Sequence, residues 1–357
     1  MMPTPRLEID LEKISHNTRT LVERLADRDI SVTGVTKATL GSTEIAEAMI
    51  KSGVISIGDS RIENIESMRF DQVTAPMDLI RSPMLSQAER VVVNANLSFN
   101  TEIEVIRNLS LEAQKLHRTH GVVIMVELGD LREGIMPDDL IALVGETLCL
   151  PNIALKGIGT NLACRCGVSP DARNMAVLSA LANLIEATFD LKLEIVSGGN
   201  SANLEWALSG AETGRINNLR LGEAILLGCE TLHRQPIEGL FTDALTLVAE
   251  VIETKIKPSQ PSGKIAQTAF GEAEPVIDRG QVSQSILAIG RQDVDPDGLL
   301  PPDGIEIMGA SSDHLILVSG HCSLPVGSEV AFQLNYSALV QAMTSPFVTK
   351  VVQSDRS

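Results

Sequence analysis

Lys37 stands at the end of a strand-like run, in the stretch SVTGVTKATLG at residues 31–41. A glycine, Gly41, follows four residues later, and a helical pattern begins after it. An ammonium group is costly to remove from water, so a lysine at the buried tip of a strand needs an explanation. Either its side chain reaches past the strand end into solvent, or it performs chemistry. The residues at the other strand ends help to decide between these two interpretations.

Polar residues also end the other strand-like runs of this region. The polar strand ends are Lys37, Asp59, Asp130, Asn161, the segment 197–201 and Arg220. In a barrel of parallel strands, the carboxyl ends of the strands form the face on which active sites lie. Packing of a core needs none of these groups. Their repetition at strand ends therefore favours a site on this face and a functional role for Lys37.

The motif SGGNSAN at residues 197–203 adds a site for an anion. Its glycines give the backbone freedom, Ser201 supplies a hydroxyl, and the start of the following helical pattern offers N–H groups that favour a phosphate. Gly222 and Glu223 come after Arg220 and supply a second set of N–H groups. A strand-end lysine beside an anion cradle fits pyridoxal 5'-phosphate, whose aldehyde forms a Schiff base with lysine.

The composition limits the class of partner. The chain has 357 residues and a formal net charge of −17, with 44% hydrophobic but only 3% aromatic residues, so its core must be aliphatic. The acidic balance argues against nucleic acid and favours a cationic or zwitterionic small substrate. No stretch has the apolar length of a membrane span, and residues 1–13 lack the apolar core of a signal peptide. We therefore expect a cytoplasmic protein without a membrane partner.

The cysteines predict free thiols rather than a metal site. There are five of them, Cys149, Cys164, Cys166, Cys229 and Cys322, and an odd number in a cytoplasmic chain argues against a disulfide framework. Cys164 and Cys166 have the spacing of half a metal site, but no second pair with zinc-type spacing exists. We therefore expect no metal.

Apolar strand-like runs alternate with amphipathic helical patterns from residue 30 to about residue 230. The strands are expected at residues 31–37, 54–59, 77–84, 91–96, 122–130, 154–161, 193–200 and 217–222. Near-continuous apolar strands separated by helices are typical of a parallel sheet. Eight of them predict an α/β fold, a (β/α)8 barrel of the TIM type, over residues 1–235. A doubly wound sheet is the alternative architecture.

The pattern changes after residue 235. Seven prolines, from Pro258 to Pro325, interrupt short runs such as SQSILAIG, HLILVSG and EVAFQL. Short strands broken by turn residues predict an all-β domain over residues 236–357. The tail SALVQAMTSPFVTKVV predicts a helical turn and a last strand.

Several motifs, taken in order, resemble the alanine racemase superfamily of pyridoxal phosphate enzymes. They are VTKATLG, GDSRIEN, ELGDLREG, GIGTNLAC, SGGNSAN, LRLGEAILLG, SSDHLIL and NYSALVQAMTSPFV, and they span nearly the whole chain. Within the superfamily, the chain is most similar to the ornithine racemase branch. The resemblance implies a cofactor-binding barrel followed by a β domain that completes the site. It also implies an isomerase that interconverts L and D amino acids by removing the Cα proton.

The resemblance implies roles for individual residues. Lys37 would carry the cofactor covalently, Arg220 would face its pyridine nitrogen, and Arg132 would help to hold the substrate. The other implied cofactor contacts are Asn161, where alanine racemases carry a histidine, and the phosphate-binding residues Ser201, Gly222, Glu223 and Tyr336. Arginine keeps its proton, so it would leave the ring nitrogen unprotonated and make the ring a weaker electron sink, which suits racemisation.

Three of these residues could instead have a purely structural role. Arg220 could instead pair with a carboxylate of the barrel. Arg132 could form a solvated salt bridge on the surface. Tyr336 could be a core ring with a wet hydroxyl group.

Racemisation needs a proton acceptor on each face of Cα. By the resemblance, Lys37 serves one face, and in alanine racemases a tyrosine of the partner subunit serves the other. Here the segment AIGRQDVDP offers Arg291 instead, and the only tyrosine, Tyr336, already has another role. His314, Arg291 and Cys322 are therefore the candidates for the second base, and histidine is the side-chain type most often suited to proton transfer near neutral pH.

The expected substrate is a basic amino acid such as ornithine, and the expected assembly is a homodimer. The sequence does not fix which amino acid is used. A distal ammonium group would need a carboxylate, and the candidates are Asp293, Asp295, Asp313 and Glu223, of which we place Asp313 with Arg132 at the substrate.

Three alternative functions remain open at this point. The nearest is a pyridoxal phosphate lyase like the D-threonine aldolases and D-serine dehydratases, which hold a metal by a C-terminal histidine and a cysteine or aspartate. In GHCSLP, however, His321 and Cys322 are adjacent, where a gap of one residue is expected. The others are a pyridoxal phosphate homeostasis protein, which would lack the β domain, and a barrel enzyme without cofactor.

Overall fold

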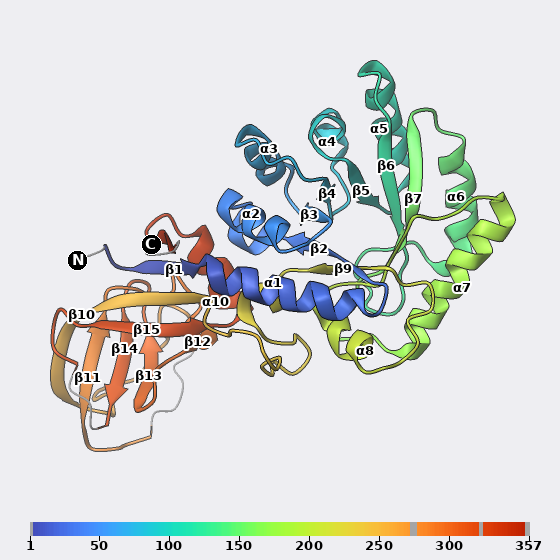
Figure 1. Cartoon of the computed structure of the whole chain (residues 1–357). Coiled ribbons are helices and arrows are strands. Elements are labelled where there is room, and N and C mark those ends of the chain that lie inside the picture. Colours follow the sequence, from blue (N-terminus) through green and yellow to red (C-terminus); the bar gives the residue numbers. More distant parts are fainter. Residues whose placement is uncertain (1–2, 272–276, 321–323, 354–357) are drawn as a thin grey trace. The chain divides into compact units, whose positions relative to one another are not determined.

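The computed structural model describes residues 3–271, 277–320 and 324–353. The chain divides into two compact units, one of residues 12–241 and one of residues 1–11 together with 242–357 (Figure 1). The sequence analysis predicts a boundary near residue 235, and the contacts divide the chain between residues 241 and 242. The first eleven residues, however, belong with the C-terminal unit rather than with the barrel, because their strand pairs with two strands of that unit.

The unit of residues 12–241 contains a closed barrel of eight parallel strands, which excludes a doubly wound sheet. Its strands are β2 (Ser31–Val35), β3 (Ser56–Asp59), β4 (Met77–Leu79), β5 (Leu97–Asn100), β6 (His120–Met125), β7 (Ile153–Gly159), β8 (Ile195–Ser197) and β9 (Asn218–Leu221). They follow one another around the barrel in chain order, and β9 closes it by pairing with β2. The α/β fold predicted from the sequence is confirmed.

Nine α-helices are described in or beside this unit. They are α1 (Leu11–Ala26), α2 (Thr43–Lys51), α3 (Ile62–Phe70), α4 (Ala88–Asn94), α5 (Ile103–Lys115), α6 (Leu140–Leu148), α7 (Ala172–Phe189), α8 (Leu204–Leu208) and α9 (Glu223–Leu227). Side chains fix several of their starts: Ser42 caps α2, and Asp171 and Asn174 form a capping box at α7.

One predicted strand is wrong. Residues 91–96 were expected to form a strand from their three consecutive valines, but they include the end of helix α4, whose Val91 and Val92 face inward and are buried. The strand lies directly after them, as β5. Burial of one helix face overrides the intrinsic preference of valine for strands in this case.

The interior of the barrel has an apolar side and a polar side. Phe99, Val123 and Met125 form a buried cluster on strands β5 and β6. The guanidinium of Arg220, on β9, lies 4.9 Å from the centre of the Phe99 ring. Because β5 and β9 lie on opposite sides of the barrel, this contact runs through its interior. Arg220 therefore projects inward, and so does Asn218 two residues earlier on the same strand.

The second unit is a mainly antiparallel sheet with one helix. Its elements are β1 (Arg6–Asp10), β10 (Leu245–Pro258), β11 (Gln281–Leu287), β12 (Leu299–Leu300), β13 (Ile305–Ala310), β14 (Leu315–Ser319), β15 (Glu329–Leu334), α10 (Tyr336–Thr344) and β16 (Thr349–Gln353). The strand order is β12-β15-β10-β11-β14-β13, and β1 pairs antiparallel with β10 and parallel with β16. The all-β architecture and the final helix and strand agree with the sequence analysis.

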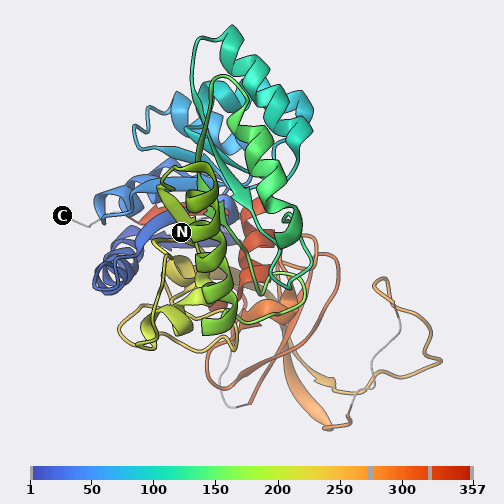
Figure 2. The same ribbon diagram turned by 90° about the vertical axis from the view of Figure 1, so that its right-hand side faces the viewer.

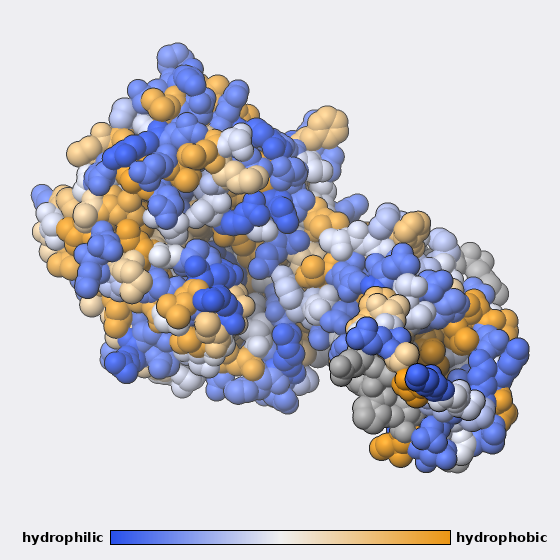
Figure 3. Space-filling model, turned by 180° about the vertical axis from the view of Figure 1, so that it is seen from behind, coloured by the Kyte–Doolittle hydropathy of each residue, from blue (hydrophilic) through white to orange (hydrophobic). Residues whose placement is uncertain are grey.

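Within this unit, the end of β10 near Pro258 and the start of β11 near Gln281 project from the rest of the sheet (Figure 2). Residues 260–271, which follow β10, are exposed. On the face drawn in Figure 3, hydrophilic residues are interspersed with hydrophobic ones. No helix among the described residues is both long and apolar enough to cross a membrane.

Candidate active site

Lys37 lies directly beyond the end of strand β2, at the first position of a short 3-10 helix, Lys37–Thr39. Its side chain is exposed, so the lysine does not bear the cost of burial that its position in the sequence suggests. The carbonyl of Thr36 accepts hydrogen bonds from the backbone N–H groups of Thr39 and Gly41 and from the Thr39 hydroxyl. These bonds fix the turn that carries Lys37.

Asp59, at the end of the neighbouring strand β3, supports the same turn. Its carboxylate accepts hydrogen bonds from the Thr36 hydroxyl at 2.9 Å, the Arg61 backbone N–H at 2.9 Å and the Asn64 amide at 3.0 Å. Burial raises the pKa of Asp59, and these hydrogen bonds partly offset that rise. Asp59, which the sequence marks as a polar strand end, thus positions the residue before Lys37.

The segment 198–203 folds into a compact turn at the end of β8. Asn200 caps the short helix Ser201–Asn203 by accepting from the Ala202 N–H at 2.7 Å, and Asn203 accepts from the Asn200 N–H at 3.1 Å. Gly199 has φ +145°, and a Cβ there would overlap the Asn203 side chain. Only glycine fits this position, which explains the second glycine of the motif.

Ser201 and Gly222 bring the ends of three strands together. The buried Ser201 hydroxyl oxygen accepts from the Ala224 backbone N–H at 3.2 Å, which leaves its own hydrogen for another acceptor. A Cβ at Gly222 would lie 3.0 Å from the Val35 carbonyl oxygen at the end of β2. Gly222 and Glu223 therefore lie beside the strand that leads to Lys37. Burial raises the pKa of Glu223, and the charges of Arg234 and, to a smaller extent, Lys37 partly offset that rise.

Arg220 is buried, with 5% of its surface exposed, and its guanidinium meets only uncharged oxygens at hydrogen-bond distance. It donates to the Ser197 hydroxyl, to the Thr160 carbonyl at 2.7 Å and, at 3.5 Å, to the Asn161 side-chain oxygen. Burial lowers the pKa of Arg220 to about 10, so the group remains a cation at neutral pH. The alternative of a direct ion pair with a barrel carboxylate does not describe this arrangement.

Asn161 joins Arg220 to the anion-binding turn. Its side-chain oxygen accepts from the Asn200 amide at 3.1 Å and makes the long contact with Arg220. Its amide nitrogen is buried and has no hydrogen-bond partner among the residues that the structure describes. A buried donor without a partner is costly, so this nitrogen is available to a bound ligand.

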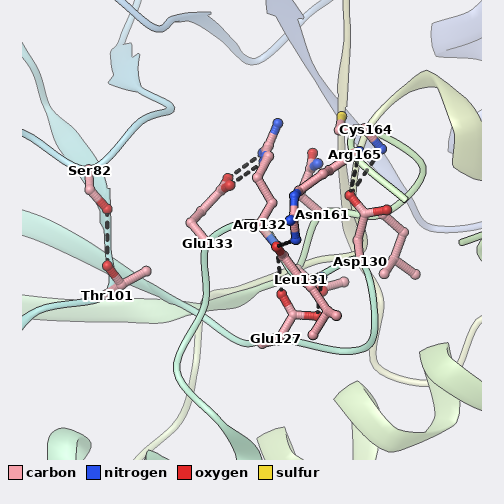
Figure 4. Close-up of polar contacts among 12 residues, drawn as sticks. Ser82, Thr101, Glu127, Asp130, Leu131, Arg132, Glu133, Asn161, Cys164 and Arg165 are labelled. Atoms are coloured by element: carbon pink, nitrogen blue, oxygen red, sulfur yellow. Dashed lines mark hydrogen bonds and ion pairs between the residues drawn. The ribbon is translucent and has the colours of Figure 1, made fainter. Parts of the chain in front are cut away.

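Arg132 lies in the loop that follows β6, and its guanidinium forms an ion pair with the adjacent Glu133 (Figure 4). The loop is held by Glu127, whose carboxylate accepts from the backbone N–H groups of Leu131 at 3.0 Å and Arg132 at 3.2 Å. Glu133 was not predicted as a site residue. A carboxylate directly after the arginine in the sequence was the available signal.

Asp130 ties the loop after β6 to the loop after β7. The buried carboxylate accepts from the backbone N–H groups of Cys164, Arg165 and Cys166 at 2.9–3.1 Å (Figure 4). Burial raises the pKa of Asp130, but these N–H groups outweigh burial and hold the pKa below its ordinary value. Cys164 and Cys166 are exposed free thiols, and no group of three or more metal-ligating side chains occurs among residues 3–271, 277–320 and 324–353.

The second unit brings its own predicted residues together. The backbone N–H of Arg291 donates to the Ser311 carbonyl at 2.9 Å, and the Gln341 amide of helix α10 donates to the Arg291 carbonyl at 2.6 Å. The turn 311–314 carries Asp313 and His314, and His314 Nδ1 lies 2.9 Å from the Asp313 carboxylate. The Arg291 guanidinium lies 3.6 Å from the carboxylate of Asp297.

Two further sequence predictions have different outcomes. Tyr336 is the first residue of α10 and is half-buried, and Asn335 caps this helix by accepting from the Ala338 N–H at 2.9 Å. His321 and Cys322, which include one candidate for the second base, lie outside the described residues.

The six barrel residues of the predicted cofactor site lie at the carboxyl ends of strands β2, β7, β8 and β9. Asn200, which links two of them, was not predicted.

Comparison with known proteins identifies the family. Residues 9–229 match the family model described as alanine racemase, N-terminal domain. The chain is 36% identical to a lysine racemase of Thermotoga maritima, over 99% of each chain. It is 38% identical to an ornithine racemase of Acetoanaerobium sticklandii, over 97% of this chain and 99% of the other.

The fold also occurs in a lyase. The crystal structure of D-threonine aldolase from Filomicrobium marinum is similar with a TM-score of 0.77 and 18% identity, covering 96% of this chain and 88% of that one. At this identity, the similarity shows a shared fold and nothing about the reaction. The family match and the near-complete alignments to relatives at 36–38% identity show that the chain belongs to the alanine racemase family, whose enzymes depend on pyridoxal phosphate.

Proposed function

We propose that this protein is a pyridoxal phosphate-dependent racemase of a basic amino acid. The observation that carries the proposal is that Lys37 follows strand β2 and Arg220 lies on strand β9, which pairs with β2. The relatives that act on lysine and ornithine support the class of substrate. We propose ornithine or lysine, without choosing between them.

The residues present fit the cofactor. The unpartnered Asn161 amide nitrogen and the hydroxyl hydrogen of Ser201 provide donors for a phosphorylated ring. Lys37 would hold the cofactor covalently. Ser201, Gly222 and Glu223 would bind its phosphate. When bound, pyridoxal phosphate supplies an electron sink that makes the Cα proton of an amino acid acidic.

Arg220 sets the strength of that electron sink. Its guanidinium is held by three acceptors and remains charged, so toward the ring nitrogen it can only donate. A ring nitrogen that accepts from arginine stays unprotonated. The site thereby favours removal and return of one proton at Cα over reactions that need a stronger sink.

The proton transfers belong to two different groups. The ε-amine of Lys37 takes or returns the Cα proton on one face. For the opposite face we propose His314, with Arg291 as the second candidate, because the turn 311–314 and Arg291 are joined by backbone hydrogen bonds. The half-exposed His314 ring is held by the Asp313 carboxylate, which suits a group that exchanges protons with solvent. This assignment requires that the second unit of a partner subunit, in a homodimer, reaches the barrel.

Arg132 and Asp313 are the proposed substrate contacts. Arg132 would receive the substrate carboxylate, and Asp313 would receive the distal ammonium of a basic amino acid. Arginine is suited to carboxylates because its N–H groups match their geometry.

Chiral chromatography tests the proposal directly. The full-length protein is incubated with pyridoxal phosphate and, separately, with L-ornithine, L-lysine and L-alanine. The expected result is formation of the D enantiomer from a basic amino acid, faster than from alanine, and none with Lys37→Ala. Cleavage or deamination of the amino acid instead, especially if it required a metal, would identify a lyase and refute the racemase.

A further inference from the structure

A line of hydrogen-bonded side chains crosses the polar side of the barrel interior and ends at Arg220. It connects strands β9, β8, β2, β3 and β4. In order, its members are Arg220, Ser197, Asn218, Thr33, Ser56 and Asp78, all buried with 5% or less of their surface exposed. Of these six residues, the proposed reaction uses Arg220 alone.

The contacts along the line are short and continuous. Arg220 donates to the Ser197 hydroxyl, and Ser197 donates to the Asn218 oxygen at 2.6 Å. The Asn218 amide donates to the Thr33 hydroxyl at 3.1 Å. The Thr33 and Ser56 hydroxyls are 2.9 Å apart, and Ser56 donates to the Asp78 carboxylate at 2.6 Å.

Each member of the line donates a hydrogen bond to the next, from Arg220 toward Asp78. Ser56 uses its only hydrogen on Asp78, so Thr33 must be the donor in the Thr33–Ser56 bond. Thr33 in turn can only accept from Asn218. The line therefore begins at a cation and ends at an anion, an arrangement in which each bond polarises the next. Protonation of Asp78 would remove the negative charge at the end of the line and weaken this polarisation.

Asp78 also contributes negative charge near the buried guanidinium. Burial lowers the pKa of Arg220, and of the charged groups Glu133 raises it most, Arg132 lowers it, and Asp78 raises it to a smaller extent. Glu133 is already paired with Arg132. Asp78 is hydrogen-bonded to Ser56, and Arg220 is the charged group that acts on it. Burial raises the pKa of Asp78 to about 6, so the carboxylate is ionised above that pH.

We propose that Asp78 is a positioning residue that, through this line of hydrogen bonds, fixes the orientation of the Arg220 guanidinium and hence the protonation of the cofactor ring nitrogen. The proposal rests on the proposed function for its second half only. The first half, the coupling of Asp78 to Arg220, concerns the barrel alone. Asp78 is buried within strand β4 and is not one of the proposed substrate or cofactor contacts, so the proposal assigns it an effect through Arg220.

Two substitutions break the line in different ways. Asp78→Asn removes the charge and keeps the shape. Thr33→Val removes the middle hydroxyl and keeps the charge of Asp78. Thr147→Val is the matched control, because the buried Thr147 hydroxyl bonds only within its own helix, to the Leu143 carbonyl at 2.8 Å.

The first measurement uses the full chain without added cofactor. The Nε–H resonance of Arg220, assigned by its loss in Arg220→Lys, is followed from pH 5 to pH 8. Wild type and Thr147→Val are expected to show an inflection near pH 6, whereas Asp78→Asn and Thr33→Val show none. An inflection that persists in both line variants overturns the coupling. If Asp78→Asn fails to fold, Thr33→Val alone decides.

The second measurement uses the protein loaded with pyridoxal phosphate labelled with ¹⁵N in the ring. The ring nitrogen signal is expected to show the same inflection in wild type and to lose it in both variants. At pH 7.5, kcat of the variants should fall about tenfold with little change in KM, as expected for a displaced catalytic group. If the Arg220 resonance shows the inflection in wild type but the ring nitrogen signal does not, the second half of the proposal is overturned. Failure of the protein to bind the cofactor or to racemise refutes the proposed function and leaves the Arg220 result standing.

Discussion

Asp78 and His120 make opposite contributions to the pH dependence of stability, and substitution of Asp78 should reveal both. Burial raises the pKa of Asp78 from 3.8 to about 6. Burial lowers the pKa of His120, 1% exposed and 2.8 Å from the Ser98 hydroxyl, from 6.5 to about 4. Each difference corresponds to about 3 kcal/mol of unfolding free energy.

The signs are opposite. The stabilisation that Asp78 contributes is fully present below the pKa that this residue has in the unfolded chain. It is lost as the pH rises through about 6, because the carboxylate then ionises while buried. The contribution of His120 is present above 6.5 and is lost as the pH falls through about 4, because the unfolded chain takes up a proton that the buried ring cannot. In the wild type, the two changes nearly cancel between pH 7.5 and pH 4.

Asp78→Asn removes the contribution of Asp78 and leaves that of His120. On acidification from pH 7.5 to pH 4, the variant should lose about 3 kcal/mol of stability relative to wild type. His120→Gln should change by a similar amount in the opposite direction, and the double variant should again follow wild type. Urea unfolding at each pH, followed by the fluorescence of the single tryptophan, Trp206, reports on the barrel unit, where this residue is buried. Parallel pH profiles for wild type and Asp78→Asn would show that the carboxylate titrates normally in the folded barrel, and would refute the reasoning.

Three further predictions concern the reaction. Lys37→Ala should abolish the yellow covalently bound cofactor and all racemisation; borohydride reduction and peptide mapping check the site, and a label on Lys156 instead would contradict it. Arg220→Glu should favour a protonated ring nitrogen and increase half-transamination, detected as pyridoxamine phosphate; no increase, with unchanged racemisation, would remove Arg220 from the ring. His314→Asn should slow racemisation about a hundredfold while cofactor absorbance stays normal; near-normal rates would leave Arg291 as the next candidate.

The barrel was predictable because strand-like runs alternate with amphipathic helical patterns along the sequence. Strand β5 was the strand that the prediction misplaced. Its sequence is LSFN, with Ser98 and Asn100 buried, and the valines just before it give the stronger apolar signal. Those valines, however, belong to a helix. Hydrophobicity shows that a segment is buried, but tertiary packing decides which backbone conformation buries it.

Pairing between distant segments was not predictable. Strand β1 joins the C-terminal unit because its backbone pairs with β10 and β16, and backbone hydrogen bonds leave little trace in side-chain sequence. The site shows the same contrast. Lys37, Ser201 and Arg220 were found because each ends a strand. Asp78 lies within a strand, and only the register that aligns Gly58 with Asp78 and Thr33 with both Ser56 and Arg220 connects it to the site.

The remote position of Asp78 has a chemical consequence. A carboxylate in direct contact with Arg220 would neutralise its charge but would also occupy two of the N–H groups that the guanidinium presents. By placing the anion at the far end of four uncharged side chains, the barrel balances the charge and leaves Arg220 free to donate elsewhere. The ionised carboxylate costs stability at neutral pH, as the pKa of Asp78 implies. A buried carboxylate at the end of a polar line is what a role in tuning Arg220 requires, since packing alone would favour an apolar residue.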